Sequence, residues 1–255
     1  MQGSFKAGTV AGIEIRVHYT WLFAFALIAW SLADGYFPGW NNSFSARTDL
    51  FLGLVATLLF FGSLLIHELA HSLVARARGL RVDSITLFIF GGVSSISQEP
   101  TSPKEEFLVA LVGPLASIVL AAIYWQIDRL APAASAIAAV AEYLAFANLA
   151  LGTFNLIPAY PLDGGRVLRS ILWQVTGDEP RATRIASYVG QLFAFALIGW
   201  GVLGVIGGEI SSGVWLVFIG WFLNGAAESA RRHPAARRPT AGFSETSHDS
   251  PQIRL

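Results

Sequence analysis

The chain has 255 residues, of which 54% are hydrophobic and 13% charged, and its mean hydropathy is +0.55. This composition excludes a soluble domain of this size and indicates a polytopic membrane protein, while the zero net charge gives no overall field that would favour nucleic acid. There are no cysteines, which excludes disulfides, thiolate metal sites and cysteine nucleophiles and leaves His, Asp and Glu as candidate ligands.

Residues 1–19 are expected to form a short N-terminal strand segment on the cytoplasmic side, because their second half alternates apolar and polar positions. His18, at the end of this strand, is a candidate metal ligand, although a lone histidine between a strand and a helix is more often structural. The first membrane span is expected at 20–33, extended to Tyr36 by interfacial aromatics. No small-residue cleavage site follows it, so we expect a retained span and not a secretory signal.

The second span, at 50–76, contains the motif His67-Glu68-Leu69-Ala70-His71. On a helix the two histidines lie on one face about one turn apart, which suits two ligands of one zinc ion, and Glu68 can polarise a zinc-bound water. A match this short also arises by chance in helices. Ionisable groups inside a span are costly, however, and are functional by default, which favours a zinc hydrolase.

After this span, two β-prone runs at 82–90 and 93–97 flank Gly91-Gly92, which predicts a hairpin. The hairpin is too short to cross a bilayer. Because it is apolar, we expect it to be re-entrant and next to the active site, where protein or a water-filled cavity satisfies its backbone. An ordinary surface hairpin is the alternative.

The remaining spans are expected at 107–126, 133–156, 185–206 and 210–227, with a kink at Gly113-Pro114. Glu142, in the fourth span, fits a contact between helices better than a proton path. The Pro- and Gly-rich loop at 157–165 is expected to break any helix and to hold Asp163. The predicted domains are thus the N-terminal segment, a six-span core at 20–228 and a disordered basic tail at 229–255.

The positions of the basic residues predict the topology. With six spans and both termini cytoplasmic, 15 lysines and arginines lie inside and only Arg47 and Arg129 lie outside. His71 stands five residues before Arg76, about 7 Å along a helix. The motif is therefore expected one to two turns below the cytoplasmic surface, and Asp163, just before Arg166, approaches the same leaflet.

A catalytic zinc needs three protein ligands and one open position, and Asp163 is the best third ligand among the carboxylates at this depth. At this point the chain resembles the site-2 protease family of intramembrane zinc metalloproteases over roughly residues 10–228. The resemblance rests on the HExxH motif, on Phe90-Gly91-Gly92-Val93, on Gly113-Pro114-Leu115, and on the long motif from Asn155 to Arg166, which contains Pro158, Pro161 and Leu162-Asp163-Gly164-Gly165.

The resemblance implies one zinc ion held by His67, His71 and Asp163, with Glu68 as general base and then acid and Asn155 near the substrate carbonyl. It also implies regulated cleavage of a single-span membrane protein in a prokaryotic plasma membrane, such as an anti-sigma factor or a pro-transcription factor. Unlike many relatives, the sequence shows no inserted PDZ domain and no soluble nucleotide-binding domain after the spans. Regulation through such domains is not expected.

Two other classes of function remain open. A divalent-metal transporter could use the same ligands, but it would be expected to have polar positions along several spans, and the last two are almost bare. A metal-binding scaffold without catalysis is the other alternative, against which Glu68 argues. The sequence has no Gly-x-Gly-Asp motif and no rhomboid-type serine surroundings, which disfavours other intramembrane proteases.

The sequence therefore predicts an all-α polytopic membrane protein with about six transmembrane helices, a small β-element near the cytoplasmic face and zinc endopeptidase activity. A regular helix cannot be cut, because its carbonyls are tied into the hydrogen-bond ladder. The substrate must be locally extended, and an exposed hairpin edge could pair with it as an added strand. The candidate substrate-binding residues are Gly91, Gly92, Val93 and Ser94.

Overall fold

The computed structural model describes residues 3–89, 91–96 and 100–232. The elements follow one another as β1 (Ser4–Val10), β2 (Ile13–His18), α1 (Thr20–Ser31), the π-helical turn η1 (Leu32–Tyr36), α2 (Phe37–Trp40), α3 (Ala46–Ala77), β3 (Val82–Phe88), β4 (Gly91–Ile96), α4 (Pro103–Leu130), α5 (Ala136–Asn155), α6 (Asp163–Thr176), α7 (Glu179–Ile206) and α8 (Ile210–Arg232).

Within the described residues, six helical segments are long and apolar enough to cross a membrane. They are Thr20–Trp40, which joins α1, η1 and α2, together with α3, α4, α5, α7 and nearly all of α8. This confirms the predicted fold class. Most of the predicted spans are several residues shorter than the helices, because hydropathy detects the apolar centre of a helix and misses its polar ends.

Side-chain caps explain where several of these helices begin. Ser45 accepts a hydrogen bond from the backbone of Thr48 at the start of α3, and Ser102 and Ser135 cap α4 and α5 in the same way. Pro103 follows the cap of α4 at the first helical position, where no backbone donor is lost. The helix continues through Pro114 to Leu130.

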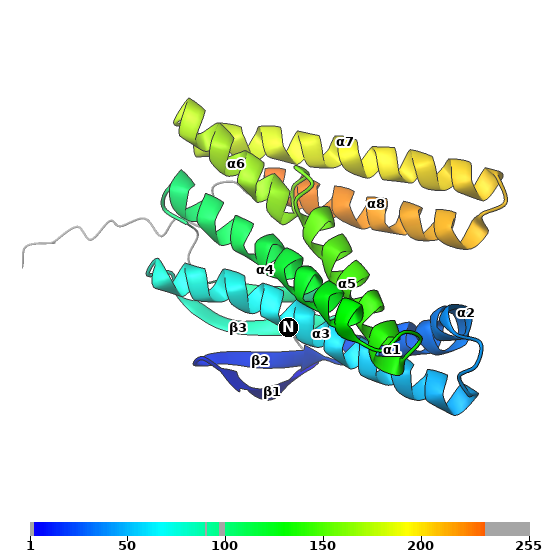
Figure 1. Cartoon of the computed structure of the whole chain (residues 1–255). Coiled ribbons are helices and arrows are strands. Elements are labelled where there is room, and N and C mark those ends of the chain that lie inside the picture. Colours follow the sequence, from blue (N-terminus) through cyan, green and yellow to red (C-terminus); the bar gives the residue numbers. More distant parts are fainter. Residues whose placement is uncertain (1–2, 90, 97–99, 233–255) are drawn as a thin grey trace, which may run out of the picture.

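The predicted hairpin is half of a four-stranded sheet with the order β1-β2-β3-β4. β2 pairs with β3 in parallel, and β1 and β4 are antiparallel edge strands. Ile13, Ile15 and Ile85 form a buried cluster against Leu65 and Leu69 of α3. The sheet therefore lies along the half of α3 that carries the HExxH motif (Figure 1).

Helix α6 was not predicted, and the expectation that 157–165 would break any helix is wrong at its end. The helix begins at Asp163 itself and includes Gly164 and Gly165. It was missed because it is short and amphipathic, so its mean hydropathy resembles that of a loop. Gly177, with a φ of 68°, ends the helix in the left-handed conformation that glycine adopts freely.

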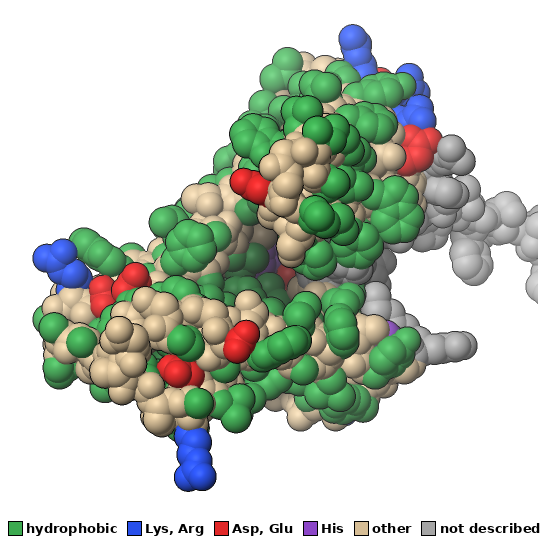
Figure 2. Space-filling view, turned by 90° about the vertical axis from the view of Figure 1, so that its right-hand side faces the viewer, with side chains coloured by type: hydrophobic (Ala, Val, Ile, Leu, Met, Phe, Trp, Pro, Cys, Tyr) green, Lys and Arg blue, Asp and Glu red, His purple; other side chains and the backbone are tan. Residues whose placement is uncertain are grey.

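Helices α7 and α8 form a close pair on the side of the molecule opposite the sheet (Figure 1). Figure 2 shows a hollow between the upper part of the molecule, where this pair lies, and the lower part, where α1 and α3 lie. A histidine side chain (purple) and an acidic side chain (red) are visible at the bottom of the hollow. Polar groups therefore line a recess in a largely apolar surface.

Candidate metal centre

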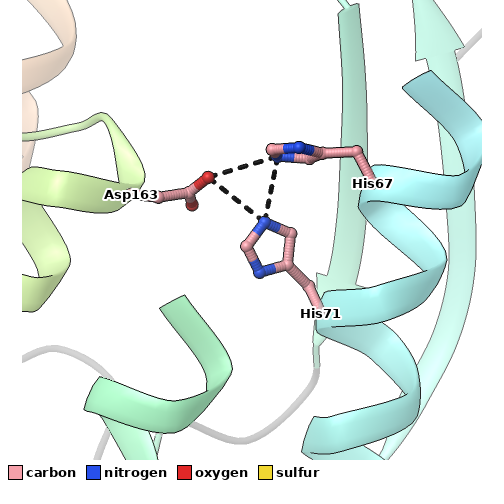
Figure 3. A group of neighbouring side chains, drawn as sticks. All are labelled: His67, His71 and Asp163. Atoms are coloured by element: carbon pink, nitrogen blue, oxygen red, sulfur yellow. Dashed lines mark hydrogen bonds and ion pairs between the residues drawn. The ribbon is translucent and has the colours of Figure 1, made fainter. Parts of the chain in front are cut away.

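Three side chains from two distant segments converge at one point. His67 and His71 lie one turn apart on α3, and Asp163 is the first residue of α6. Oδ2 of Asp163 is 3.2 Å from Nε2 of each histidine, and the two Nε2 atoms are 3.1 Å apart (Figure 3). The structure thus brings together the three residues proposed from sequence as ligands.

Contacts on the far side of each imidazole fix its orientation. Nδ1 of His71 donates to the backbone carbonyl of Val109 at 2.6 Å, and Nδ1 of His67 lies 2.9 Å from Oγ of Ser117. A carbonyl can only accept, so Nδ1 of His71 carries the proton. When the ring of His71 is neutral, its Nε2 atom then bears a lone pair that faces the lone pairs of the Asp163 carboxylate. These lone pairs repel each other unless a cation lies between them and is bound by both atoms.

The size and charge of the site fit zinc. The three ligand atoms lie 3.1–3.2 Å from one another, a spacing that would let all three reach one zinc ion at the usual distances of about 2.0–2.2 Å. The set of two imidazoles and one carboxylate also matches zinc chemistry. Among the described residues, His67, His71 and Asp163 form a group whose ligand atoms lie close enough together to hold a metal ion.

The site is buried and its carboxylate is ionised. The exposed fractions are 3% for His67 and 5% for His71. Burial raises the pKa of the Asp163 carboxyl, but hydrogen bonds and positive charge from the protonated forms of His67 and His71 lower it more, so the pKa lies below its usual range. The carboxylate is therefore in the form that a metal ligand requires.

Glu68 faces the sheet. Its Oε2 accepts a hydrogen bond from Oγ of Ser94 on β4 at 2.8 Å, and Oγ of Ser72 donates to Ser94 at 3.1 Å. A Cβ on Gly92 would overlap the side chain of Glu68, so the close approach of β4 to α3 requires glycine there. The predicted position of the hairpin beside the motif agrees with these contacts.

Other candidates have different partners. Nδ2 of Asn155 donates to the carbonyl of Leu151 in its own helix. Nδ1 of His18 lies 2.8 Å from Oγ1 of Thr20, as expected for a structural histidine. Glu142 accepts a hydrogen bond from Nε1 of Trp40 at 2.6 Å, which is a contact between two helical segments.

The residues that orient the two histidines were not predicted from the sequence. Ser117 is fully buried in the middle of an apolar helix, and a polar residue near the centre of the predicted span at 107–126 was a usable signal. Val109 contributes through its backbone, so its side chain gave no signal at all.

The comparisons with known proteins point the same way. The family model of peptidase family M50 matches residues 55–130 and 126–197. Over 245 residues, or 95% of the chain, the sequence is 38% identical to "Putative zinc metalloprotease Rip3" of Mycobacterium tuberculosis and 39% identical to "Putative zinc metalloprotease sll0528" of Synechocystis. The chain spans 62% and 64% of the length of these two relatives.

A solved structure, "Site-2 Protease from Methanocaldococcus jannaschii", has the same fold. The TM-score is 0.60 at 28% sequence identity, and the match covers 90% of this chain and 95% of the other. The fold of this chain thus has a structural precedent over almost its whole length.

Proposed function

Because this chain belongs to peptidase family M50, the site-2 proteases, we propose that it is an intramembrane zinc endopeptidase that cleaves the transmembrane segment of a membrane-bound substrate. The observation that carries the proposal is the convergence of His67, His71 and Asp163 beside Glu68. The names of its relatives as zinc metalloproteases support the same activity.

The residues of the site take distinct roles in this proposal. When bound, zinc supplies a Lewis acid that polarises the scissile carbonyl and lowers the pKa of a water molecule. Glu68, between the two histidines in sequence, removes a proton from the attacking water and later returns it to the leaving amine. Val109 and Ser117 keep both imidazoles in place.

Asn155 is assigned to the substrate carbonyl, as the family motif implies. Its amide presently donates to Leu151 at 3.0 Å, at the last turn of α5. In this role the side chain changes rotamer when substrate arrives. The bond to Leu151 is then given up for one to the substrate.

Strand β4 is proposed as the element that holds the substrate. It is an edge strand with β3 as its neighbour in the sheet, so one side of its backbone can pair with an unwound segment. Ser94 of the same strand contacts Glu68, so a paired segment would pass next to the base. Gly91, Gly92 and Val93 belong to the same pairing edge, and the missing side chain of Gly92 lets this strand lie close to Glu68.

The substrate is proposed to be a single-span membrane protein such as an anti-sigma factor or a pro-transcription factor, cleaved in a regulated manner. Entry is through the hollow seen in Figure 2. We place both termini in the cytoplasm of a prokaryotic cell, because the basic residues concentrate on that side.

The proposal is tested with purified protein in liposomes that also contain a single-span membrane protein. Cleavage is expected in the presence of zinc, to stop with a chelator and to return when zinc is added back. Elemental analysis is expected to find one zinc ion per chain and to show loss of metal in His67→Ala, His71→Ala and Asp163→Ala. Full occupancy in Asp163→Ala would mean that the third ligand is another residue, and zinc flux without cleavage would favour a transporter.

A further inference from the structure

A buried ion pair joins α4, which orients the two histidines, to α6, which carries Asp163. Glu106 of α4 is 0% exposed and Arg169 of α6 is 7% exposed. Nε and Nη2 of Arg169 both lie 2.6 Å from Oε1 of Glu106, and Nη1 lies 3.4 Å from Oγ1 of Thr183 on α7. Nε of Arg166, also on α6, is 3.9 Å from the same carboxylate oxygen.

The two partners lie on the helices that set the ligand geometry. α4 provides the groups that orient both imidazoles, Val109 and Ser117, and Glu106 stands one turn before Val109. α6 provides the third ligand at its first residue, and Arg169 follows Asp163 by six residues, about 9 Å along the helix. The ion pair therefore controls how α6 sits against α4, and with it how close Asp163 comes to the histidines.

Stability alone is a weak explanation for this pair. Taking two charges out of water costs as much as their attraction returns, and apolar residues of similar volume often replace a buried pair without loss. Oε2 of Glu106 has no hydrogen-bond partner among the described residues, so part of this cost is not recovered. The two short contacts of Arg169 with Oε1 of Glu106 do, however, fix the position of α6 relative to α4.

We propose that Glu106 and Arg169 are positioning residues that act through Asp163, holding it at the distance at which it becomes the third zinc ligand. The inference rests on the proposed zinc site. The contacts given above for Glu106 and Arg169 involve none of the metal ligands, and the proposed proton transfers use neither residue. Loss of the pair lets the start of α6 drift from α4, so the site keeps two histidines and loses the carboxylate.

The test measures zinc affinity of the full chain in detergent by competition with a chromophoric chelator. Arg169→Gln is expected to weaken zinc binding roughly 10- to 100-fold, the usual effect of removing a residue that orients a ligand. Arg169→Lys keeps the charge but loses the two-point contact, so an intermediate effect is expected. The control is Asn148→Leu, which removes a buried contact between α5 and Ser63 of α3 without changing α4 or α6; it is expected to bind zinc as the wild type does.

A double-mutant cycle separates positioning from general damage. If Arg169 acts through Asp163, Arg169→Gln has no further effect on zinc affinity in an Asp163→Ala background. Equal effects in both backgrounds, or wild-type affinity in folded Arg169→Gln, would overturn the inference. If Asp163→Ala alone leaves zinc affinity unchanged, the ligand set of the proposed function is wrong instead.

Arg169→Gln leaves a buried carboxylate unpaired and risks misfolding. Glu106→Gln with Arg169→Gln removes both charges and gives the same expectation of weakened zinc binding. If neither neutral form folds, the cycle is run with Arg169→Lys, in which Glu106 remains paired. Wild-type zinc affinity of Arg169→Lys when Asp163 is present, or an equal loss of affinity with and without Asp163, would overturn the inference.

Discussion

The hydroxyl of Ser94 donates a hydrogen bond to the carboxylate of Glu68, with 2.8 Å between Oγ and Oε2. Ser94 belongs to the edge strand β4, and Glu68 belongs to the membrane helix α3. The hydroxyl of Ser72, also on α3, donates to Ser94. The proposed base is therefore held by the strand that is proposed to bind the substrate, so substrate pairing and base position are linked.

Replacing Ser94 with alanine tests this link. A hydrogen bond to a charged group is worth about 1.5–3 kcal/mol, so kcat is expected to fall roughly ten- to a hundredfold if the bond orients Glu68. Zinc content should not change, because Ser94 does not contact the ligands. Ser95→Ala is the matched control, since neighbouring residues on a strand point to opposite faces. Equal loss in both variants would argue against an orienting role.

A proline scan tests whether β4 pairs with the substrate. Proline at each of Val93, Ser94, Ser95 and Ile96 in turn deletes one backbone donor. Only every other donor of a strand points at its free edge, so cleavage is expected to fall at alternate positions while zinc content stays constant. Uniform tolerance, or losses that follow zinc content or folding, would mean that the strand is merely structural.

Two glycines are predicted to affect different steps. A Cβ on Gly113 would overlap the His71 ring, so Gly113→Ala is expected to lose zinc. A Cβ on Gly92 would overlap Glu68 but no ligand, so Gly92→Ala is expected to keep zinc and lose cleavage. Elemental analysis beside a cleavage assay distinguishes them. Gly62→Ala, on α3 with nothing near its Cβ, is the control and is expected to be neutral or to stabilise by about 0.5–1 kcal/mol.

Much of this architecture could be predicted from sequence because its signals are strong and local. A run of about twenty apolar residues specifies a span by length alone. The spacing of His67 and His71 places them on one helical face, and the loop before Asp163 is marked by prolines and glycines. The three candidate ligands accordingly meet within 3.2 Å.

Other features depend on contacts that no local pattern reveals. The parallel pairing of β2 with β3 joins segments separated by all of α1 and α3. The ion pair of Glu106 with Arg169 joins residues 63 positions apart. Glu106 alone resembles an acid in the first turn of a helix, and Arg169 lies in the middle of α6, a helix that was not predicted. The last two spans looked almost bare, yet Gln191 of α7 donates to Asn224 and Glu228 of α8.

The tail at 229–255 lies almost entirely outside the described residues, and its composition predicts that it is dispensable for chemistry. It is rich in Arg, Pro, Ser and Thr and has too few apolar residues to form a core. Truncation after Arg232 retains Arg231 and Arg232 at the end of α8. Normal membrane insertion and normal cleavage are expected in liposomes, and a protein that inserts but does not cleave would refute this.

The proposed chemistry assigns Glu68 to proton transfer and not to metal binding. Glu68→Gln keeps the shape of the side chain and can still bond to Ser94, so the metal site should be undisturbed. The measurement that tests this account most directly is zinc content and peptide-bond cleavage on the same preparation of this variant. We expect one zinc ion per chain and a loss of cleavage of about 10²- to 10⁴-fold or more. Substantial remaining proteolysis, or loss of zinc together with activity, would contradict the assignment of Glu68 as the base.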